Sequence, residues 1–232
     1  MVVIINHDKD ENSKSKNPSK EENPKNEKVE DIKDKYQYLD EVKITKERIA
    51  VIIGKEGSTK KSIEKNTNSR LIVDSKEGTV KFLSNNPITM LQLKDIITAI
   101  GRGFNPNIAM NLLKTDYVLE VIDISDFGRT KKAKMRLKGR VIGEQGKARR
   151  TIENLTETDI SVYGKTVSII GEIEHVSVAK RAILSLLSGS PHSRVYSWLE
   201  KKRKEMKYRE MLTNTEFNNI KEEFADDLKF DE

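Results

Sequence analysis

Two glycines three positions apart mark the segment of this sequence that is best suited to bind a phosphate backbone. Gly143 and Gly146 frame Glu144 and Gln145, and Lys147 opens a basic stretch with a helical pattern directly behind them. Glycine has no Cβ, so it accepts unusual backbone angles and lets a second backbone approach closely. A helix that starts here points unpaired N–H groups and its positive dipole end toward the loop. The segment therefore predicts an anion site of the kind that a nucleic-acid backbone fills.

The residues around this loop are strongly basic, with ten Lys or Arg and one Glu between positions 129 and 150. We expect the backbone amides of the loop and the flanking cations to contact phosphate, while three apolar side chains form a floor for bases. Glu144 is the exception, because a carboxylate repels phosphate; it either hydrogen-bonds a base edge or faces away. The predicted binding residues are Lys138, Arg140, Ile142, Gly143, Glu144, Gln145, Gly146, Lys147, Arg149, Arg150, Ile160 and Val162.

The charge of the whole chain agrees with a polyanionic partner. The formal net charge is +6, yet residues 1–35 carry about −1 and residues 210–232 carry −6, which leaves +13 on residues 36–209. A basic body of this kind favours nucleic acid; a Lys/Glu-rich solvated surface is the alternative. There are no cysteines, so disulfides and thiolate metal sites are excluded. No apolar run reaches the roughly 18 residues of a membrane span, so we expect a cytoplasmic protein that contacts no membrane. We also expect no cofactor.

The loop is one of two copies in the chain. Gly54-Lys55-Glu56-Gly57 lies 89 positions earlier, and the same offset relates Ile63 to Ile152 and Leu71 to Ile160. One register across loop, helix and strand predicts duplication of a domain of about 70 residues.

The elements around each loop follow one order: strand, helix, G-x-x-G, helix, strand, strand, helix. In the second copy the two later strands are expected near Ile160 and Thr166 and the last helix between Val176 and Leu187. The predicted organisation is a disordered tail over 1–35, domains over 36–104 and 117–190 with a connector over 105–116, a basic C-terminal helix over 191–212, and an acidic mobile tail over 213–232.

This order resembles a KH domain of the eukaryotic, or type I, kind, in which the loop clamps about four nucleotides of single-stranded RNA. The expected fold class is therefore α+β: two tandem type I KH domains, each β-α-α-β-β-α with a three-stranded sheet packed on three helices.

The second copy is similar to a narrower family, the Krr/Pno/Dim-type ribosome-assembly factors, in their archaeal form. The similarity rests on the runs Gly139–Gly143 and Ile160–Val167 and on Pro191–Tyr196 after the domain. It implies a non-enzymatic factor that binds the 3′ region of small-subunit rRNA. It also implies contact with the endonuclease that trims this end and with the alpha subunit of initiation factor two.

Two further sites are weaker predictions. The first loop carries less charge, so it contacts either RNA or protein, through Gly54, Lys55, Glu56, Gly57, Lys60 and Lys61. The C-terminal helix is a candidate surface for a partner or RNA, through His192, Arg194, Tyr196, Trp198, Lys201, Lys202 and Arg203.

Catalytic functions fit the sequence poorly. Neither glycine loop matches the G-x-x-x-x-G-K-[ST] phosphate loop, and His7, His175 and His192 have no ligand-like spacing. We therefore expect no catalytic and no metal residues. The alternatives to an assembly factor are a translation-linked adaptor and a general KH protein of RNA turnover.

Overall fold

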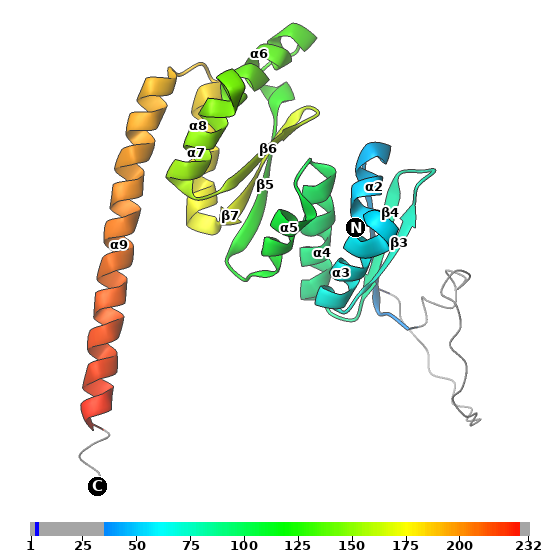
Figure 1. The fold of residues 1–232 in the computed structure, drawn as a ribbon, viewed down its shortest axis with the longest axis horizontal. Helices are drawn as coiled ribbons and strands as arrows, with labels where there is room; N and C mark the ends of the chain where they lie inside the picture. Colours follow the sequence, from blue (N-terminus) through cyan, green and yellow to red (C-terminus); the bar gives the residue numbers. More distant parts are fainter. Residues whose placement is uncertain (1–2, 5–34, 228–232) are drawn as a thin grey trace. The chain divides into compact units, whose positions relative to one another are not determined.

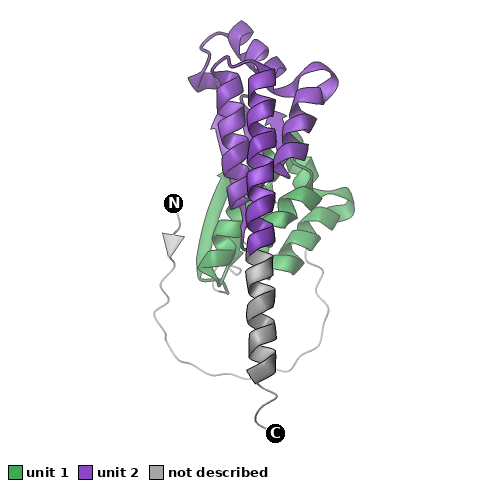
Figure 2. Cartoon of the chain, turned by 90° about the vertical axis from the view of Figure 1, so that its left-hand side faces the viewer, with its two compact units in different colours: residues 1–115 green, residues 116–232 purple. Residues whose placement is uncertain are grey.

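The computed structural model describes residues 3–4 and 35–227, which fall into two compact units, Met1–Thr115 and Asp116–Glu232 (Figure 2). Most of the predicted N-terminal tail and the last five residues of the predicted C-terminal tail lie outside the described residues. Among the described helices, none is both long and apolar enough to cross a membrane.

Unit 1 contains the first copy of the repeat (Figure 1). In chain order its elements are β2 (Tyr38–Lys43), α2 (Lys46–Ile53), η1 (Lys55–Gly57), α3 (Ser58–Thr67), β3 (Arg70–Asp74), β4 (Thr79–Ser84), α4 (Pro87–Gly101), α5 (Pro106–Ala109) and η2 (Met110–Leu113). Together with β1 (Val3–Ile4), these strands form a sheet of the order β1-β2-β4-β3 that is antiparallel throughout.

Unit 2 repeats this order and adds a long helix. Its elements are β5 (Tyr117–Asp123), η3 (Ile124–Asp126), α6 (Lys131–Ile142), η4 (Glu144–Gly146), α7 (Lys147–Thr156), β6 (Asp159–Tyr163), β7 (Thr166–Glu172), α8 (Ile173–Leu187) and α9 (His192–Asp227). The antiparallel sheet has the order β5-β7-β6, with β7 in the centre. Both units thus have the predicted β-α-α-β-β-α order of the type I KH fold.

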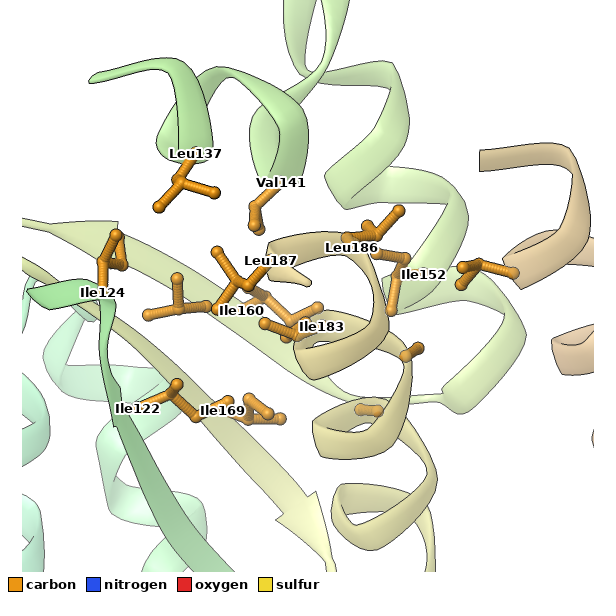
Figure 3. Packing of buried hydrophobic residues seen from close by; sticks show 14 of the residues in the cluster. Ile122, Ile124, Leu137, Val141, Ile152, Ile160, Ile169, Ile183, Leu186 and Leu187 are labelled. Carbon is orange, nitrogen blue, oxygen red and sulfur yellow. The ribbon is translucent and has the colours of Figure 1, made fainter. Parts of the chain in front are cut away.

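The core of unit 2 lies between the sheet and its helices (Figure 3). Ile169 on the central strand, Ile152 on α7 and Ile183 on α8 are completely buried. Burying a side chain of this size contributes about 1.5–3 kcal/mol, so the apolar positions of the repeat fix the helices on the sheet. This packing holds α6 and α7 at a set angle on either side of the glycine loop.

In both copies, a glutamate on the helix after the glycine loop is hydrogen-bonded to the strand that follows this helix. Glu153 Oε1 accepts a hydrogen bond of 2.9 Å from the backbone N–H of Ile160, and Glu64 Oε1 accepts one of 2.8 Å from that of Leu71. The carboxylate thereby satisfies a backbone donor at the start of a strand. The repeat of Glu64 and Glu153 is thus explained by folding.

The hydrogen-bonded Glu153 leads to a prediction about stability. Burial raises the pKa of Glu153, despite the hydrogen bond from Ile160 and the nearby Arg149. The folded chain therefore holds this proton more tightly than the unfolded chain, whose glutamate pKa is about 4.3. The ionised group costs stability above the folded pKa, and this cost disappears as the pH falls through it.

Glu153→Gln keeps an acceptor for Ile160 without the charge, so it should be at least as stable as the wild type at pH 7 and lose that advantage below pH ~4. Glu153→Ala removes the acceptor and should cost about 1–3 kcal/mol. Urea unfolding followed through Trp198, the single tryptophan, reports on unit 2. A Gln variant as unstable as the Ala variant at pH 7 would show that the charge itself is required.

The structure departs from the predicted boundaries at both ends. Val3–Ile4, inside the predicted tail, forms strand β1 and pairs with β2, Val3 opposite Leu39. Helix α9 was expected to end at residue 212 but continues to Asp227. The sequence contains no Gly or Pro after Pro191, so no helix-breaking residue ends α9 where the charge changes sign.

Candidate nucleic-acid interface

The two glycine loops have the same backbone conformation. In the second loop, φ/ψ is 71°/178° at Gly143, 52°/25° at Gln145 and 78°/12° at Gly146. In the first loop, Gly54, Glu56 and Gly57 have 71°/179°, 54°/27° and 77°/14°. The predicted register of the repeat therefore holds down to individual backbone angles.

The first glycine of each loop is required for two reasons. A Cβ on Gly143 would lie 2.7 Å from the backbone nitrogen of Ala148, and one on Gly54 would lie 2.8 Å from that of Thr59. A positive φ with ψ near 180° is also a conformation that essentially only glycine adopts. Gly146 differs, because the atoms nearest to its Cβ would be those of the Arg150 guanidinium, at 3.9 Å.

The helix behind the second loop begins without a side-chain cap. Gly146 is the N-cap of α7 and offers no side-chain acceptor, whereas Thr130 Oγ1 accepts the N–H of Ala133 at 3.1 Å at the start of α6. The N–H of Lys147 donates to the Glu144 carbonyl, whereas no side chain caps the N–H groups that follow, so these keep their affinity for an external acceptor. A phosphate or another anion is the acceptor that the helix dipole favours.

The cations of the predicted set differ in what they contact. Lys147 and Arg150 are exposed at the start of α7, and Lys138 is half-buried on α6. Arg149 lies on α7 with its Nε 3.5 Å from Glu153 Oε2. Lys147 and Arg150 are therefore the side chains beside the loop that are most available to phosphate.

Arg140 was predicted to bind RNA, but its guanidinium is used inside unit 2. It donates to the carbonyls of Leu186 at 3.0 Å and Ser190 at 2.7 Å, at the C-terminal end of α8. His192 Nε2 lies 2.8 Å from the Arg140 carbonyl. These bonds fix α6, the end of α8 and the start of α9 relative to one another, because they join α6 to backbone groups on either side of the turn between α8 and α9.

The predicted apolar floor is only partly exposed. Ile142, directly before the loop, is 36% exposed, whereas Ile160 is 3% exposed and belongs to the core. Val162 is half-buried and packs against that core. Ile160 is thus a core residue and not a surface for bases. Alternation along the strand does not distinguish a side chain that faces the helices from one that forms a floor for bases, so the sequence pattern alone could not decide between these positions. Glu144 and Gln145 are both exposed at the tip of the loop.

A glycine that the sequence prediction did not include lies on the same helix. Gly139 is in the interior of α6, and a Cβ there would meet nothing within 4 Å. A helix-interior glycine costs about 0.5–1 kcal/mol relative to alanine, and nothing within unit 2 requires it. The signal in the sequence was a glycine inside a basic helical pattern, one turn before Gly143.

The first loop has the geometry of the second with less charge. Lys55, Glu56 and Lys61 are exposed, and Lys60 lies 3.9 Å from Glu64. As in the second loop, the N-cap Gly57 offers no side-chain acceptor.

The predicted residues of the C-terminal helix divide into two groups. The rings of His192 and Tyr196 are 5.9 Å apart, and Arg181 lies 5.2 Å over the Trp198 ring. Val195 and Leu199 are buried. This side of α9 therefore packs on the rest of unit 2. The remaining predicted residues are Arg194 and Lys201, which are exposed, Lys202, which pairs with Glu205, and Arg203, which lies 3.9 Å from Glu157.

Comparison with known proteins places both units in one family. A model of the second KH domain of PNO1, described as a eukaryotic type KH-domain (KH-domain type I), matches residues 118–204, and a KH domain model matches residues 39–91. A KH domain-containing protein of Methanocaldococcus jannaschii is 48% identical over 170 residues, which cover 72% of this chain and 74% of that protein.

Two further relatives have names or partners that describe their biology. The pre-rRNA-processing protein PNO1 of Chaetomium thermophilum is 35% identical over 106 residues, 44% of this chain and 41% of that protein. A solved structure of aDim2p from Pyrococcus horikoshii, in a complex with a/eIF2alpha and rRNA, is 44% identical with a TM-score of 0.68 and covers 72% of this chain and 94% of that one. This chain belongs to the archaeal tandem KH-domain proteins of the Krr/Pno/Dim type.

Proposed function

We propose that this protein is an assembly factor that binds the single-stranded 3′ region of small-subunit rRNA, mainly through the loop Gly143–Gly146. The observation that carries the proposal is the uncapped start of α7 next to two exposed cations, Lys147 and Arg150. Phosphate groups supply the missing acceptors and the opposite charge. The names of the PNO1 relatives and the rRNA in the aDim2p complex support RNA as the ligand.

The salt dependence of binding tests this proposal. The probe is an RNA oligonucleotide with the 3′-terminal sequence of the small-subunit rRNA, followed by fluorescence anisotropy. Lys147→Gln and Arg150→Gln should each weaken binding and reduce the slope of log K against log salt by about 0.7, the value for one phosphate contact on a single strand. Lys61→Gln, at the position of Arg150 in the first copy, is the matched control and should change the slope less. Unchanged slopes for both unit 2 variants would overturn the proposed contacts.

Gly139→Ala separates binding from folding. Alanine should stabilise α6 by about 0.5–1 kcal/mol, while its methyl group occupies the surface that we assign to RNA, so the affinity should fall roughly tenfold. Ala50 occupies the corresponding position of unit 1, and Ala50→Gly should lower stability without strengthening binding. Thermal unfolding and anisotropy are measured on the same samples. A Gly139→Ala variant that is more stable and binds RNA normally would refute a role for this face.

The protein partners form a second part of the proposal. The a/eIF2alpha in the aDim2p complex supports the alpha subunit of initiation factor two as a partner and an adaptor role in translation as the alternative function. The rRNA 3′-end endonuclease is proposed from the family resemblance alone. Pull-down of each purified partner after RNase treatment distinguishes the two functions, because retention of the alpha subunit without RNA supports the adaptor.

A further inference from the structure

Unit 2 has an insertion before its glycine loop that unit 1 lacks. Ten residues separate the end of β2 at Lys43 from Gly54, whereas nineteen separate the end of β5 at Asp123 from Gly143. The nine additional residues fall in η3, the turn after it and the start of α6 (Figure 1), which has 12 residues where α2 has 8. Since unit 1 forms the same β-α-α-β-β-α order without them, folding does not explain the insertion.

The insertion changes the charge in front of the loop. The nineteen residues between β5 and Gly143 contain seven Lys or Arg and one Asp, against two Lys or Arg and one Glu in the ten residues of unit 1. Arg129, Lys131, Lys132 and Arg136 are exposed, and none of them forms an ion pair with a residue that the structure describes. The first turn of α6 holds no acidic residue, although the helix dipole favours acids there. These cations therefore oppose the stability of α6 and indicate a polyanionic ligand.

The exposed residues of α6 lie on one side of the helix, which leads to the loop. Lys132, Met135, Arg136, Gly139 and Ile142 are related by steps of three and four residues, so they share one face, here called the α6 face. Met135 is 75% exposed and Ile142 is 36% exposed, and between them a Cβ on Gly139 would meet nothing within 4 Å. The α6 face thus combines two exposed cations with apolar side chains on either side of an open stretch of backbone.

Contacts within unit 2 hold the insertion in place without a ligand. Asp123 Oδ1 accepts the N–H of Ser125 at 2.8 Å, and Lys134 Nζ donates to Ser125 Oγ at 2.9 Å. A Cβ on Gly128 would lie 3.0 Å from Leu137 Cδ1, so the turn before α6 packs closely on this helix. Because these contacts fix the turn before any ligand binds, the α6 face loses little conformational entropy on binding.

We propose that the α6 face binds the RNA that continues past the nucleotides clamped by Gly143–Gly146, an inference that rests on the function proposed above. Lys132 and Arg136 contact two further phosphates, while Met135 and the open backbone of Gly139 contact bases. The face is about 16 Å long from residue 132 to the loop, at 1.5 Å per residue. Unit 2 therefore binds a longer single strand than the roughly four nucleotides of one KH loop.

The length of the RNA tests this proposal. The probes are four- and eight-nucleotide fragments that tile the 3′-terminal sequence of the small-subunit rRNA, followed by fluorescence anisotropy. The tightest four-nucleotide probe is compared with eight-nucleotide probes that extend it on its 5′ or 3′ side. One extension should bind the wild type more tightly and steepen the slope of log K against log salt by about 1.4, the value for two phosphate contacts on a single strand.

Lys132→Gln with Arg136→Gln should remove this difference in slope and weaken binding of the extended probe about tenfold, while the four-nucleotide probe keeps its affinity. Lys204→Gln with Lys207→Gln removes the same charge from exposed positions of α9 and is the matched control. An eight-nucleotide probe that binds no more tightly than the four-nucleotide probe would overturn the proposal. A double variant that weakens both probes equally would overturn it too.

Met135→Ser tests the apolar part of the face. It should weaken binding of the extended probe at least about threefold without changing the slope, because it removes no charge. Met211→Ser, at a residue 69% exposed on α9, is the control and should leave the affinity unchanged. Normal binding by Met135→Ser would overturn the contact with a base.

The four-nucleotide probe keeps this proposal separate from the proposed function. Lys147→Gln should weaken its binding, because this probe reaches only the clamp. If it does not, the clamp itself is wrong. If it does, and the extended probes gain nothing, the clamp stands and the α6 face is refuted.

Discussion

Replacing Gly143 with alanine should reduce the affinity for the rRNA 3′ oligonucleotide about a hundredfold. The Cβ would lie 2.7 Å from the backbone nitrogen of Ala148 and 2.6 Å from its Cβ, so either the loop or the start of α7 must move. The positive φ adds strain of about 1–3 kcal/mol. Both effects displace the backbone amides that we assign to phosphate. A loss of about 2.8 kcal/mol of binding free energy corresponds to about a hundredfold in affinity.

Two matched variants make this result specific. A Cβ on Gly146 would make only an ordinary contact, 3.9 Å from the Arg150 guanidinium. Only the left-handed backbone therefore opposes Gly146→Ala, at about 1–2 kcal/mol, and this variant should weaken binding less. Gly54→Ala meets the same kind of collision with Thr59 in unit 1 and tests the first loop directly. Circular dichroism and thermal unfolding must show that each variant folds. Equal losses for Gly143→Ala and Gly54→Ala would show that both loops bind RNA.

Aspartates at both tip positions of the second loop should also abolish most of the binding. Gln145 has φ 52°, a conformation that aspartate tolerates, so Glu144→Asp with Gln145→Asp adds one negative charge without changing the loop. A like charge beside phosphate should weaken binding at least about tenfold, and more at low salt.

The parallel pair, Lys55→Asp with Glu56→Asp, changes the charge of the first loop by two, yet it should have the smaller effect if the second loop is the main clamp. Anisotropy titrations at two salt concentrations compare the pairs. A larger loss from the first-loop pair would reverse the proposed order of the two sites.

The sequence was sufficient for the fold because its signals were local and repeated. The offset of 89 residues paired the glycine loops correctly, and the backbone angles of the two loops differ by at most 2°. Glycine spacing, apolar periodicity and strand order are properties of neighbouring residues, so they can be read without knowing which helix covers which face.

The sequence is less informative about residues whose contacts lie in distant parts of the chain. Arg140 looks like a phosphate contact next to the loop, but its acceptors are carbonyls 46 and 50 positions away. Ile160 alternates as a floor residue would, yet it points into the core. The sequence alone does not assign a role to Gly139; the reason to assign one is the open space around its backbone in the structure. The type of a residue does not reveal which distant parts of the chain surround it.

The function proposed for this protein depends on where it binds RNA in the cell. Ultraviolet crosslinking followed by sequencing of the bound RNA and mass spectrometry of the crosslinked peptides answers this in one experiment. We predict that crosslinked reads concentrate in the 3′ region of small-subunit rRNA and that the crosslinked peptides contain residues 138–150. Reads spread over unrelated RNAs, or crosslinks absent from this segment and concentrated elsewhere in the chain, would contradict the proposal.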